Sequence, residues 1–243
     1  MKINDKVIVI TGANGGIGSA IARKLDREGC FLVLTARRKE SLTELKEDLK
    51  NNHLEVEMDV TNNKSVLDAF TTILNNVETI DVLVNVAGVM PLTYLKNLHL
   101  DEWLNTIEVN VKGILRTLHG ALPIMKKQKK GHIVNIASVD GKELYKGGAV
   151  YGASKAAIIA LSRAMRMELS PDFNIKVTSI EPGTVDTGLR EDITDTELLN
   201  DKDYGGDEPM LDPEDIARAV LYVISEPHQS NINQLTIKPT GKS

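Results

Sequence analysis

Seven short apolar runs recur along the chain, and a longer segment with helical periodicity follows most of them. Most of the runs are rich in Val, Ile and Leu, as expected for strands that are buried on both faces. This alternation predicts an α/β fold in which helices cover both faces of a parallel sheet. The predicted strands are residues 7–10, 31–34, 54–58, 80–84, 132–137, 175–180 and 234–237, and the predicted helices are 16–28, 39–50, 63–76, 100–127, 150–170 and 213–225.

The pattern predicts one domain over residues 1–243, because no Pro-, Gly- or Ser-rich linker divides it. One segment, 186–212, is longer than most connections between elements. It lies between a predicted strand and the last helix, and long connections in this position often form lids. We therefore expect 186–212 to be a substrate lid.

The formal net charge of −5 argues against a general nucleic-acid or membrane-surface binder, since such proteins usually carry a basic excess. The charge is unevenly spread, because residues 186–215 hold twelve carboxylates against Arg190 and Lys202. The rest of the chain therefore carries a net positive charge. This distribution predicts a cationic body beneath an acidic lid.

A single cysteine, Cys30, excludes an internal disulfide and a Cys-based structural zinc site. The five histidines show no metal-ligand spacing, so we expect no metal site. No apolar stretch approaches the roughly 18 residues of a membrane span. The apolar run near the N-terminus is also too short for a signal peptide. These features predict a cytoplasmic protein.

Four glycines, Gly12, Gly15, Gly16 and Gly18, follow the first predicted strand and begin the first helix. Glycine allows close approach of backbone to a pyrophosphate, and a helix N-terminus presents N–H groups to it. The spacing G-x-x-x-G-x-G differs from the general dinucleotide fingerprint, so a tight structural turn is the alternative. The position between strand and helix favours the dinucleotide site.

The second predicted strand ends in Thr35-Ala36-Arg37-Arg38, without the carboxylate that usually holds the ribose of NAD. Two guanidinium groups suit a 2′-phosphate, which predicts a preference for NADP(H). The alternative is two solvated arginines at a helix start, where cations oppose the helix dipole.

Tyr151 and Lys155 are four residues apart near the start of a predicted helix, and therefore share one face. An ammonium group beside a phenol lowers its pKa and makes it usable in acid–base chemistry. Ser138 follows a predicted strand, at the edge where open parallel sheets bind ligands. Its hydroxyl is suited to bind a carbonyl oxygen, although an ordinary loop or capping serine is the alternative.

The order of these motifs over nearly the whole chain resembles the short-chain dehydrogenase/reductase family, with a doubly wound, seven-stranded Rossmann fold. The similarity implies catalytic roles for Asn110, Ser138, Tyr151 and Lys155. The residues that it implies for cofactor binding, beyond the glycines above and the pair Tyr151 and Lys155, are Asn14, Ile17, Arg37, Arg38, Asp59, Val60, Asn85, Ala87, Gly88, Pro182, Gly183, Val185 and Thr187. Val86 departs from the family's N-N-A-G motif, which puts the anchoring of that loop in doubt.

By this resemblance Ser138 polarises the substrate carbonyl and Tyr151 donates a proton to the developing alkoxide. Lys155 lowers the pKa of Tyr151 and binds the nicotinamide ribose, while Asn110 holds a water that links Lys155 to solvent. Residues 35–38, 138–142, 181–187 and 237–241 are most similar to NADP-dependent 3-hydroxy acid dehydrogenases and clavaldehyde-type reductases.

Substrate recognition is the least specified part of the site. Met90 follows the Asn85–Gly88 motif, and we expect it to contact substrate together with Tyr145. Lys142, Lys146 and Arg190 flank the predicted cleft and are candidates to bind a substrate carboxylate, with solvated loop charges as the alternative.

The predicted helix 150–170 is apolar nearly all round, so more than one of its faces should be buried. Burial between the sheet and neighbouring helices is one explanation. A subunit interface is the other, and it favours a homotetramer, or a homodimer, because members of the resembled family commonly form tetramers.

Together these features predict an NADP(H)-dependent enzyme that interconverts a small aldehyde or ketone and its alcohol, including 3-hydroxy acids. A non-catalytic, NADPH-binding regulator on the same fold is the alternative. An intact set of Asn110, Ser138, Tyr151 and Lys155 favours the enzyme. A structural or interaction protein would leave the glycine turn without a role.

Overall fold

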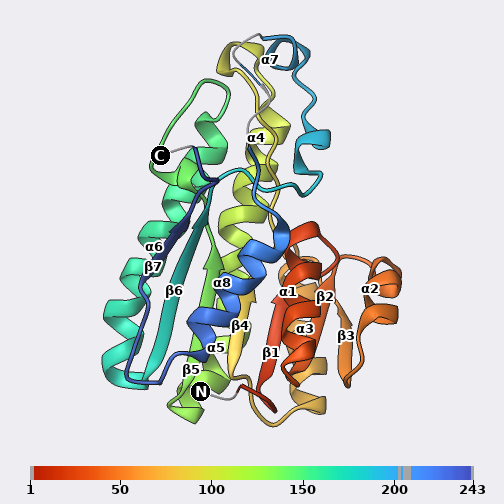
Figure 1. Ribbon diagram of the computed structural model, residues 1–243, viewed down its shortest axis with the longest axis vertical. Coiled ribbons are helices and arrows are strands. Elements are labelled where there is room, and N and C mark those ends of the chain that lie inside the picture. Colours follow the sequence, from red (N-terminus) through yellow and green to blue (C-terminus); the bar gives the residue numbers. More distant parts are fainter. Residues whose placement is uncertain (1–2, 202–203, 205–208, 242–243) are drawn as a thin grey trace.

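The computed structural model describes residues 3–201, 204 and 209–241, so part of the predicted lid lies outside the described residues. Seven parallel strands form one sheet in the order β3-β2-β1-β4-β5-β6-β7 (Figure 1). The strands are β1 (Val7–Thr11), β2 (Phe31–Ala36), β3 (His53–Glu57), β4 (Val82–Asn85), β5 (Gly131–Ile136), β6 (Ile175–Pro182) and β7 (Gln234–Ile237). The predicted α/β fold and its seven parallel strands are confirmed.

Successive residues of the central strands face opposite sides of the sheet. Ile8 and Ile10 of β1 belong to one buried cluster, whereas Val9 between them belongs to the other. The same division separates Val82 and Val84 of β4 from Leu83. The all-apolar runs in the sequence are thus explained by a sheet that is covered on both faces.

Helices cover both faces of this sheet. The α-helices are α1 (Gly16–Arg27), α2 (Thr43–Asp48), α3 (Asn63–Asn76), α4 (Leu100–Ile107), α5 (Gly113–Gln128), α6 (Ala149–Phe173), α7 (Thr196–Leu199) and α8 (Pro213–Ser225). Residues of α1 and α8 form one buried layer, with these two helices packed side by side, and residues of α3, α5 and α6 form the other (Figure 1). No helix in the described ranges is long and apolar enough to cross a membrane.

Two predicted helices differ from the structure. The segment 39–50 begins as a 3-10 turn, Lys39–Leu42, which continues into the short α2. The predicted helix 100–127 is interrupted between α4 and α5 by a π-helical turn, Glu108–Lys112. Such turns are frequent at functional sites, and this one carries the buried side chain of Asn110. Apolar periodicity did not reveal the interruption, since the helical direction continues through it.

Four shorter elements escaped the sequence analysis. They are α7 and the 3-10 turns Leu95–Asn97, Val139–Gly141 and Leu189–Asp192. Each has three or four residues, which is too few to show a period. The turns lie in the connections at the carboxyl edge of the sheet, and α7 lies beyond that edge in the direction of the strands (Figure 1).

The strand order reverses between β1 and β4, because β1 pairs with β2 on one side and with β4 on the other. In open parallel sheets a crevice forms outside the carboxyl ends of strands at such a point. A buried chain of side chains ties neighbouring strands together just below it. Asn85 Nδ2 donates to Asn135 Oδ1 at 2.8 Å, and Asn135 Nδ2 donates to Ser162 Oγ on α6 at 2.8 Å.

The contact between α3 and α5 allows no further side-chain volume. A Cβ added at Gly120 of α5 would overlap the ring of Phe70 on α3. Gly120→Ala should therefore destabilise the protein by about 1–3 kcal/mol through overpacking, offset in part by the higher helix propensity of Ala. Urea unfolding measures the change.

Phe70→Leu supplies the matched background for this test, because the smaller side chain makes room for the added methyl group. Gly120→Ala should cost much less there, and the coupling appears in a double-mutant cycle. An equal cost in both backgrounds would contradict the proposed steric cause.

Candidate active site

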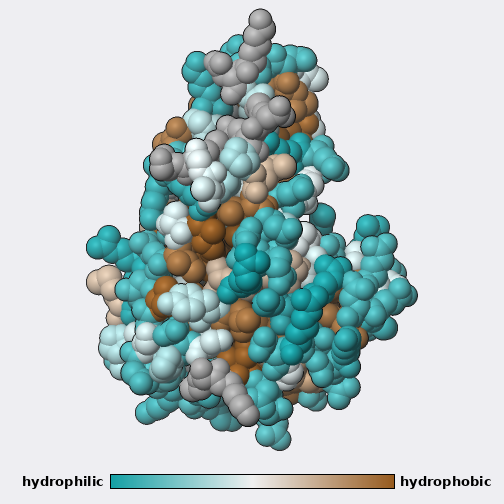
Figure 2. All heavy atoms as spheres, in the orientation of Figure 1, coloured by the Kyte–Doolittle hydropathy of each residue, from teal (hydrophilic) through white to brown (hydrophobic). Residues whose placement is uncertain are grey.

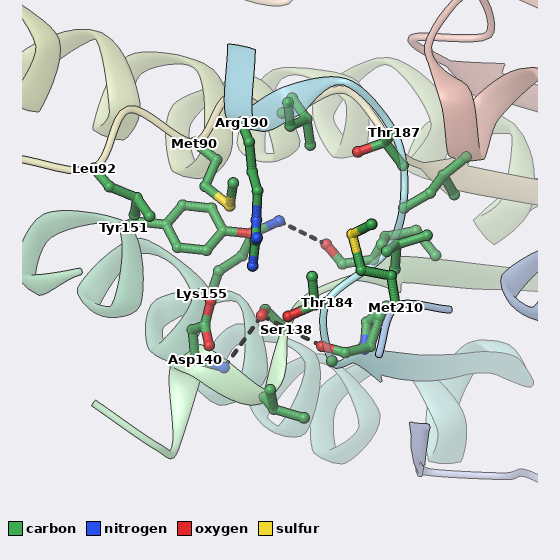
Figure 3. A pocket seen from close by; sticks show the side chains of 18 of the residues that line it. Met90, Leu92, Ser138, Asp140, Tyr151, Lys155, Thr184, Thr187, Arg190 and Met210 are labelled. Atoms are coloured by element: carbon green, nitrogen blue, oxygen red, sulfur yellow. Dashed lines mark hydrogen bonds between the residues drawn. The ribbon is translucent and has the colours of Figure 1, made fainter. Parts of the chain in front are cut away.

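A cavity of about 860 Å³ opens at the carboxyl edge of the sheet. Its walls come from the connection after β4, the end of β5, the first turns of α6 and the connection after β6. Figure 3 shows the side chains that converge in it, and Figure 2 shows apolar surface gathered near the middle of an otherwise largely hydrophilic face. The cavity therefore lies where the topology predicts a ligand site.

Tyr151 and Lys155 lie on one face of α6 and both line the cavity. Their exposed fractions are 7% and 6%, and the ammonium nitrogen of Lys155 lies 5.5 Å from the centre of the Tyr151 ring. Lys155 Nζ donates a hydrogen bond to the carbonyl of Ile136 at 3.0 Å, and the Tyr151 hydroxyl points toward the centre of the site (Figure 3). The predicted four-residue spacing thus brings the two side chains together.

Burial determines the electrostatics of this pair. It raises the pKa of Tyr151 above the usual range of a phenol, because the phenolate loses its hydration, and the Asp140 carboxylate raises it further. Burial also lowers the pKa of Lys155 to about 8, against the opposing effect of Asp140. The net shift of the Tyr151 pKa is upward, where the sequence led us to expect a lowered pKa, because desolvation is the largest cause. Tyr151 is a neutral proton donor at neutral pH.

Ser138 is the residue after Ala137, just beyond the end of β5, and is 6% exposed. Its Oγ donates to the carbonyl of Pro182 at 3.4 Å and accepts from the N–H of Asp140 at 3.1 Å. These two bonds fix the hydroxyl at the cavity wall, beside Tyr151 (Figure 3). Ser138 is also the N-cap residue of the 3-10 turn Val139–Gly141. The two roles considered for this serine, a capping residue and a residue of the site, are therefore compatible.

Asn110 joins the loop after β4 to α6. Its Oδ1 accepts from the N–H of Val89 at 2.9 Å, while its Nδ2 donates to the Val89 carbonyl at 2.9 Å and to Ser154 Oγ at 3.0 Å. Because protein groups engage both side-chain atoms, the predicted water would have to be held by the main chain of this residue. A Cβ at Gly88 would lie 3.3 Å from Asn110 Oδ1 and 3.8 Å from Lys155 Nζ.

The glycine turn between β1 and α1 lies close to this loop. Gly12 has a φ of +63°, and a Cβ there would lie 2.9 Å from Cα of Ala87. Gly15 is the N-cap residue of α1, so no side chain caps the helix, and the first turn of α1 holds no acidic residue. The helix N-terminus is therefore suited to a phosphate group. Ile17 of α1 lines the cavity, while Asn14 and Gly15 are exposed.

Thr11 at the end of β1 anchors the loop that contains Val86. Its Oγ1 accepts from the N–H groups of Val86 and Ala87 at 2.9 and 3.0 Å. Both bonds use the backbone, so they hold this loop without a polar side chain at position 86. Val86 instead presents an apolar side chain that packs against the core and lines the cavity.

The residues predicted to hold the adenosine end lie outside the cavity, at the carboxyl ends of β2 and β3. Arg37 and Arg38 are exposed, and no partner of either side chain is found among the described residues. Asp59 Oδ1 accepts from Thr61 N and Oγ1 at 2.9 and 2.7 Å, which fixes its orientation. Val60 is buried beside Gly113. Because a 3-10 turn follows Arg38, the dipole argument against solvated arginines is weaker than expected.

The connection after β6 forms the opposite wall. Four residues predicted to contact the cofactor line the cavity here: Pro182, the last residue of β6, and Gly183, Val185 and Thr187 of the connection. A Cβ at Gly16 of the glycine turn would lie 3.1 Å from Cα of Thr187. The glycine turn and this connection therefore lie against one another.

The predicted substrate residues divide into two groups. Met90, Tyr145 and Arg190 line the cavity. Lys142 does not, because its ammonium pairs with the fully buried Glu181 at 2.7 Å, which corrects its assignment to a substrate carboxylate. Lys146 lines a neighbouring, smaller pocket. The sequence predicted that both lysines lie near the cleft, but it did not show where their side chains point.

Among the cavity residues that were not predicted as site residues, Figure 3 labels Leu92, Asp140, Thr184 and Met210. Asp140 lies two residues after Ser138, and that proximity is the signal that could have revealed it. The others are ordinary apolar or hydroxyl residues in loops. Only the folded chain brings them to one cavity.

Comparison with known proteins identifies the family. A family model described as short chain dehydrogenase matches residues 6–198. An uncharacterized oxidoreductase of Staphylococcus saprophyticus is 39% identical over 246 residues, covering 100% of this chain and 99% of that protein. One from Staphylococcus epidermidis is 39% identical over 238 residues, covering 98% and 99%.

Solved structures are similar over the same length. The serine dehydrogenase of Escherichia coli has 33% identity and a TM-score of 0.84, covering 98% of this chain and 99% of that one. A closed form of serine dehydrogenase complexed with NADP+ has 33% identity and a TM-score of 0.86, covering 98% and 96%. With its seven-stranded sheet, this chain belongs to the short-chain dehydrogenase/reductase family of oxidoreductases.

Proposed function

We propose that this protein is an NADP(H)-dependent oxidoreductase that interconverts a small aldehyde or ketone and its alcohol, including 3-hydroxy acids. The observation that carries the proposal is the convergence of Ser138, Tyr151 and Lys155 on one cavity wall at the carboxyl edge of the sheet. The uncapped start of α1 lies at the same edge, where a dinucleotide pyrophosphate would bind.

Tyr151 acts as the acid in the reductive direction. Bound NADPH would supply the hydride. Tyr151 is neutral at neutral pH and donates its phenolic proton to the oxygen of the carbonyl as charge develops there. The Ser138 hydroxyl donates to that oxygen, exchanging its 3.4 Å bond to Pro182 for a stronger one. Lys155, held by the Ile136 carbonyl, stabilises the resulting phenolate through its positive charge.

The connection after β6 and the loop after β4 would hold the nicotinamide end of the cofactor. Residues 182–187 form one wall, and Asn110 fixes the loop of Gly88 and Val89 on the other. At the adenosine end, Arg37 and Arg38 would bind a 2′-phosphate, and oriented Asp59 would lie beside the adenine. This set of donors fits NADP(H), and two NADP-bound family members among the similar structures support the choice.

The substrate class rests on the cavity and on the similar structures. The cavity suits a small molecule, and Arg190 supplies a guanidinium group at its wall that would bind a carboxylate. Serine, after which two of the similar structures are named, is itself a 3-hydroxy acid. These observations support 3-hydroxy acids among the substrates. The acidic segment after β6 would act as a lid over the substrate. For the assembly we propose a homotetramer or a homodimer. For the location we propose the cytoplasm.

Removal of the phenolic proton tests the mechanism directly. Tyr151→Phe should lower the turnover of carbonyl substrates by about a hundredfold to ten-thousandfold, because the general acid is lost. NADPH binding, followed by fluorescence titration, should change little. Tyr222→Phe on the exposed face of α8 is the matched control and should remain active. Normal turnover by Tyr151→Phe would exclude the mechanism, and NADPH binding without turnover in the native protein would favour the regulator.

The cofactor preference depends on two exposed arginines. Arg37→Asp together with Arg38→Ala should lower the NADPH to NADH ratio of kcat/KM by about 10- to 100-fold or more, since charge-assisted bonds to the phosphate are lost. Lys39→Ala is the control, because that neighbouring lysine has its own partner in Glu55 at 3.8 Å. An unchanged ratio in the double variant contradicts the assignment.

The charge of Lys155 predicts a pH profile. Its pKa is lowered to about 8, so the ammonium form is complete well below that pH and is lost above it. The kcat/KM for carbonyl reduction should therefore fall as pH rises through about 8, because the phenolate loses its stabilising charge. In Lys155→Arg, whose guanidinium does not deprotonate, any remaining activity should lack this fall. If kcat/KM of the native enzyme does not change as the pH rises through about 8, the proposed charge effect of Lys155 on Tyr151 is wrong.

A further inference from the structure

Asp140 places a carboxylate in the cavity directly beside the proposed catalytic serine. Its own N–H donates to Ser138 Oγ at 3.1 Å, and it lines the same cavity as Tyr151 and Lys155. Figure 3 shows Asp140 on the same wall as Ser138 and Lys155. The acid–base mechanism proposed above does not use this side chain.

The carboxylate is only weakly satisfied by the protein. Two hydroxyl groups act on it, that of Tyr145, which donates at 3.3 Å, and that of Ser138, and within the described ranges it forms no ion pair. Partial burial raises the pKa of the Asp140 carboxyl, although the charge of Lys155 acts in the opposite direction. A partly buried carboxylate that has neutral hydroxyl partners and no cation paired with it is stabilised when a charged donor binds.

The other carboxylates at the cavity are placed differently. Glu143 pairs with Lys238 at 2.7 Å, which neutralises its charge. Asp186 and Glu191 are exposed to solvent on the connection after β6. Asp140 is thus the acidic side chain, among those described at the cavity, that combines burial with a place next to the reacting centre.

We propose that Asp140 is a specificity-determining residue that binds a substrate ammonium group on the carbon adjacent to the reacting carbon. The preferred substrates are then amino ketones and vicinal amino alcohols, a class that includes 3-hydroxy amino acids. The inference rests on the proposed function, and it names a recognition element within that site. The chemistry is a charge-assisted hydrogen bond from the ammonium to a partly desolvated carboxylate.

The position of Asp140 explains why the amino group must be adjacent. Ser138 Oγ, which binds the reacting oxygen, is also the acceptor of the Asp140 N–H, so the serine hydroxyl and the Asp140 backbone are in direct contact. An ammonium one carbon away from the carbonyl would lie within reach of the Asp140 side chain when the carbonyl oxygen contacts Ser138. Uncharged substrates of the same shape bring no charged donor to the carboxylate.

Isosteric substrate pairs test the proposal. Aminoacetone and butanone differ by an ammonium in place of a methyl group, as do serine and 3-hydroxy-2-methylpropanoate. The native enzyme should favour the amino member of each pair in kcat/KM by about 10- to 100-fold, the usual value of a hydrogen bond to a charged group. The measurement follows NADPH consumption for the ketones and NADPH formation for the alcohols.

Asp140→Asn should remove this preference while retaining the shape of the side chain. The loss should appear mainly as a higher KM for aminoacetone, with butanone turnover changed only a few-fold. Glu143→Gln is the matched control, since it removes a charge three residues away that Lys238 already neutralises. It should keep the native ratio. Thermal unfolding and butanone turnover report on folding of the variants.

The outcomes separate the two proposals. Turnover of both members of a pair with no preference in the native enzyme overturns the role of Asp140 and leaves the proposed function standing. A native preference that survives in Asp140→Asn overturns it as well. If Asp140→Asn does not fold, the native ratios decide the question alone. Absence of NADP(H)-linked turnover with these substrates and with a panel of aldehydes and ketones overturns both proposals.

Discussion

The pairing of β1 with β2 on one side and with β4 on the other is the constraint on which the rest of this structure depends. It creates the point where the chain reverses its direction of winding, and the crevice there receives the glycine turn and the loop after β4. The hydroxyl of Thr11 then joins the two, because it accepts from the N–H groups of Val86 and Ala87. Close backbone contact between Gly12 and Ala87 requires the glycine. The strand order therefore places the ligand site at the carboxyl edge of the sheet. The hydrogen bonds of Thr11 and the close approach of Gly12 to Ala87 then hold the glycine turn against the loop after β4.

Burial gives the residues of this edge their chemistry. Tyr151 and Lys155 are less than a tenth exposed, and desolvation moves both toward their neutral forms. A pairwise argument from the two charges led to the opposite expectation for the tyrosine. The larger effect is the loss of water around each group, which a spacing of four residues does not reveal. Loss of water also raises the pKa of the Asp140 carboxyl, which lines the same cavity.

The positions of several site residues depend on short turns that the apolar periodicity of the sequence does not reveal. Asn110 lies in a π-helical turn within what the apolar pattern presents as one long helix, and its side chain is engaged by Val89 and Ser154. Lys142 and Asp140 are two residues apart in one turn, yet the lysine pairs with Glu181 away from the cavity while the aspartate lines it. Two residues of opposite charge in one short segment therefore have different partners because the turn directs them apart.

The sequence by itself determined the seven parallel strands, the glycine turn and the shared face of Tyr151 and Lys155, because apolar periodicity and spacing along one element are local properties. The motif order also indicated the family that comparison confirms. The tertiary structure decided which side chains meet across elements. The engagement of Asn110, the pairing of Lys142, the anchoring of the Val86 loop and the exposure of Asp140 to the cavity depend on contacts between segments far apart in the chain. Those contacts, and the burial that shifts each pKa, exist only once the sheet and its two helical layers have packed.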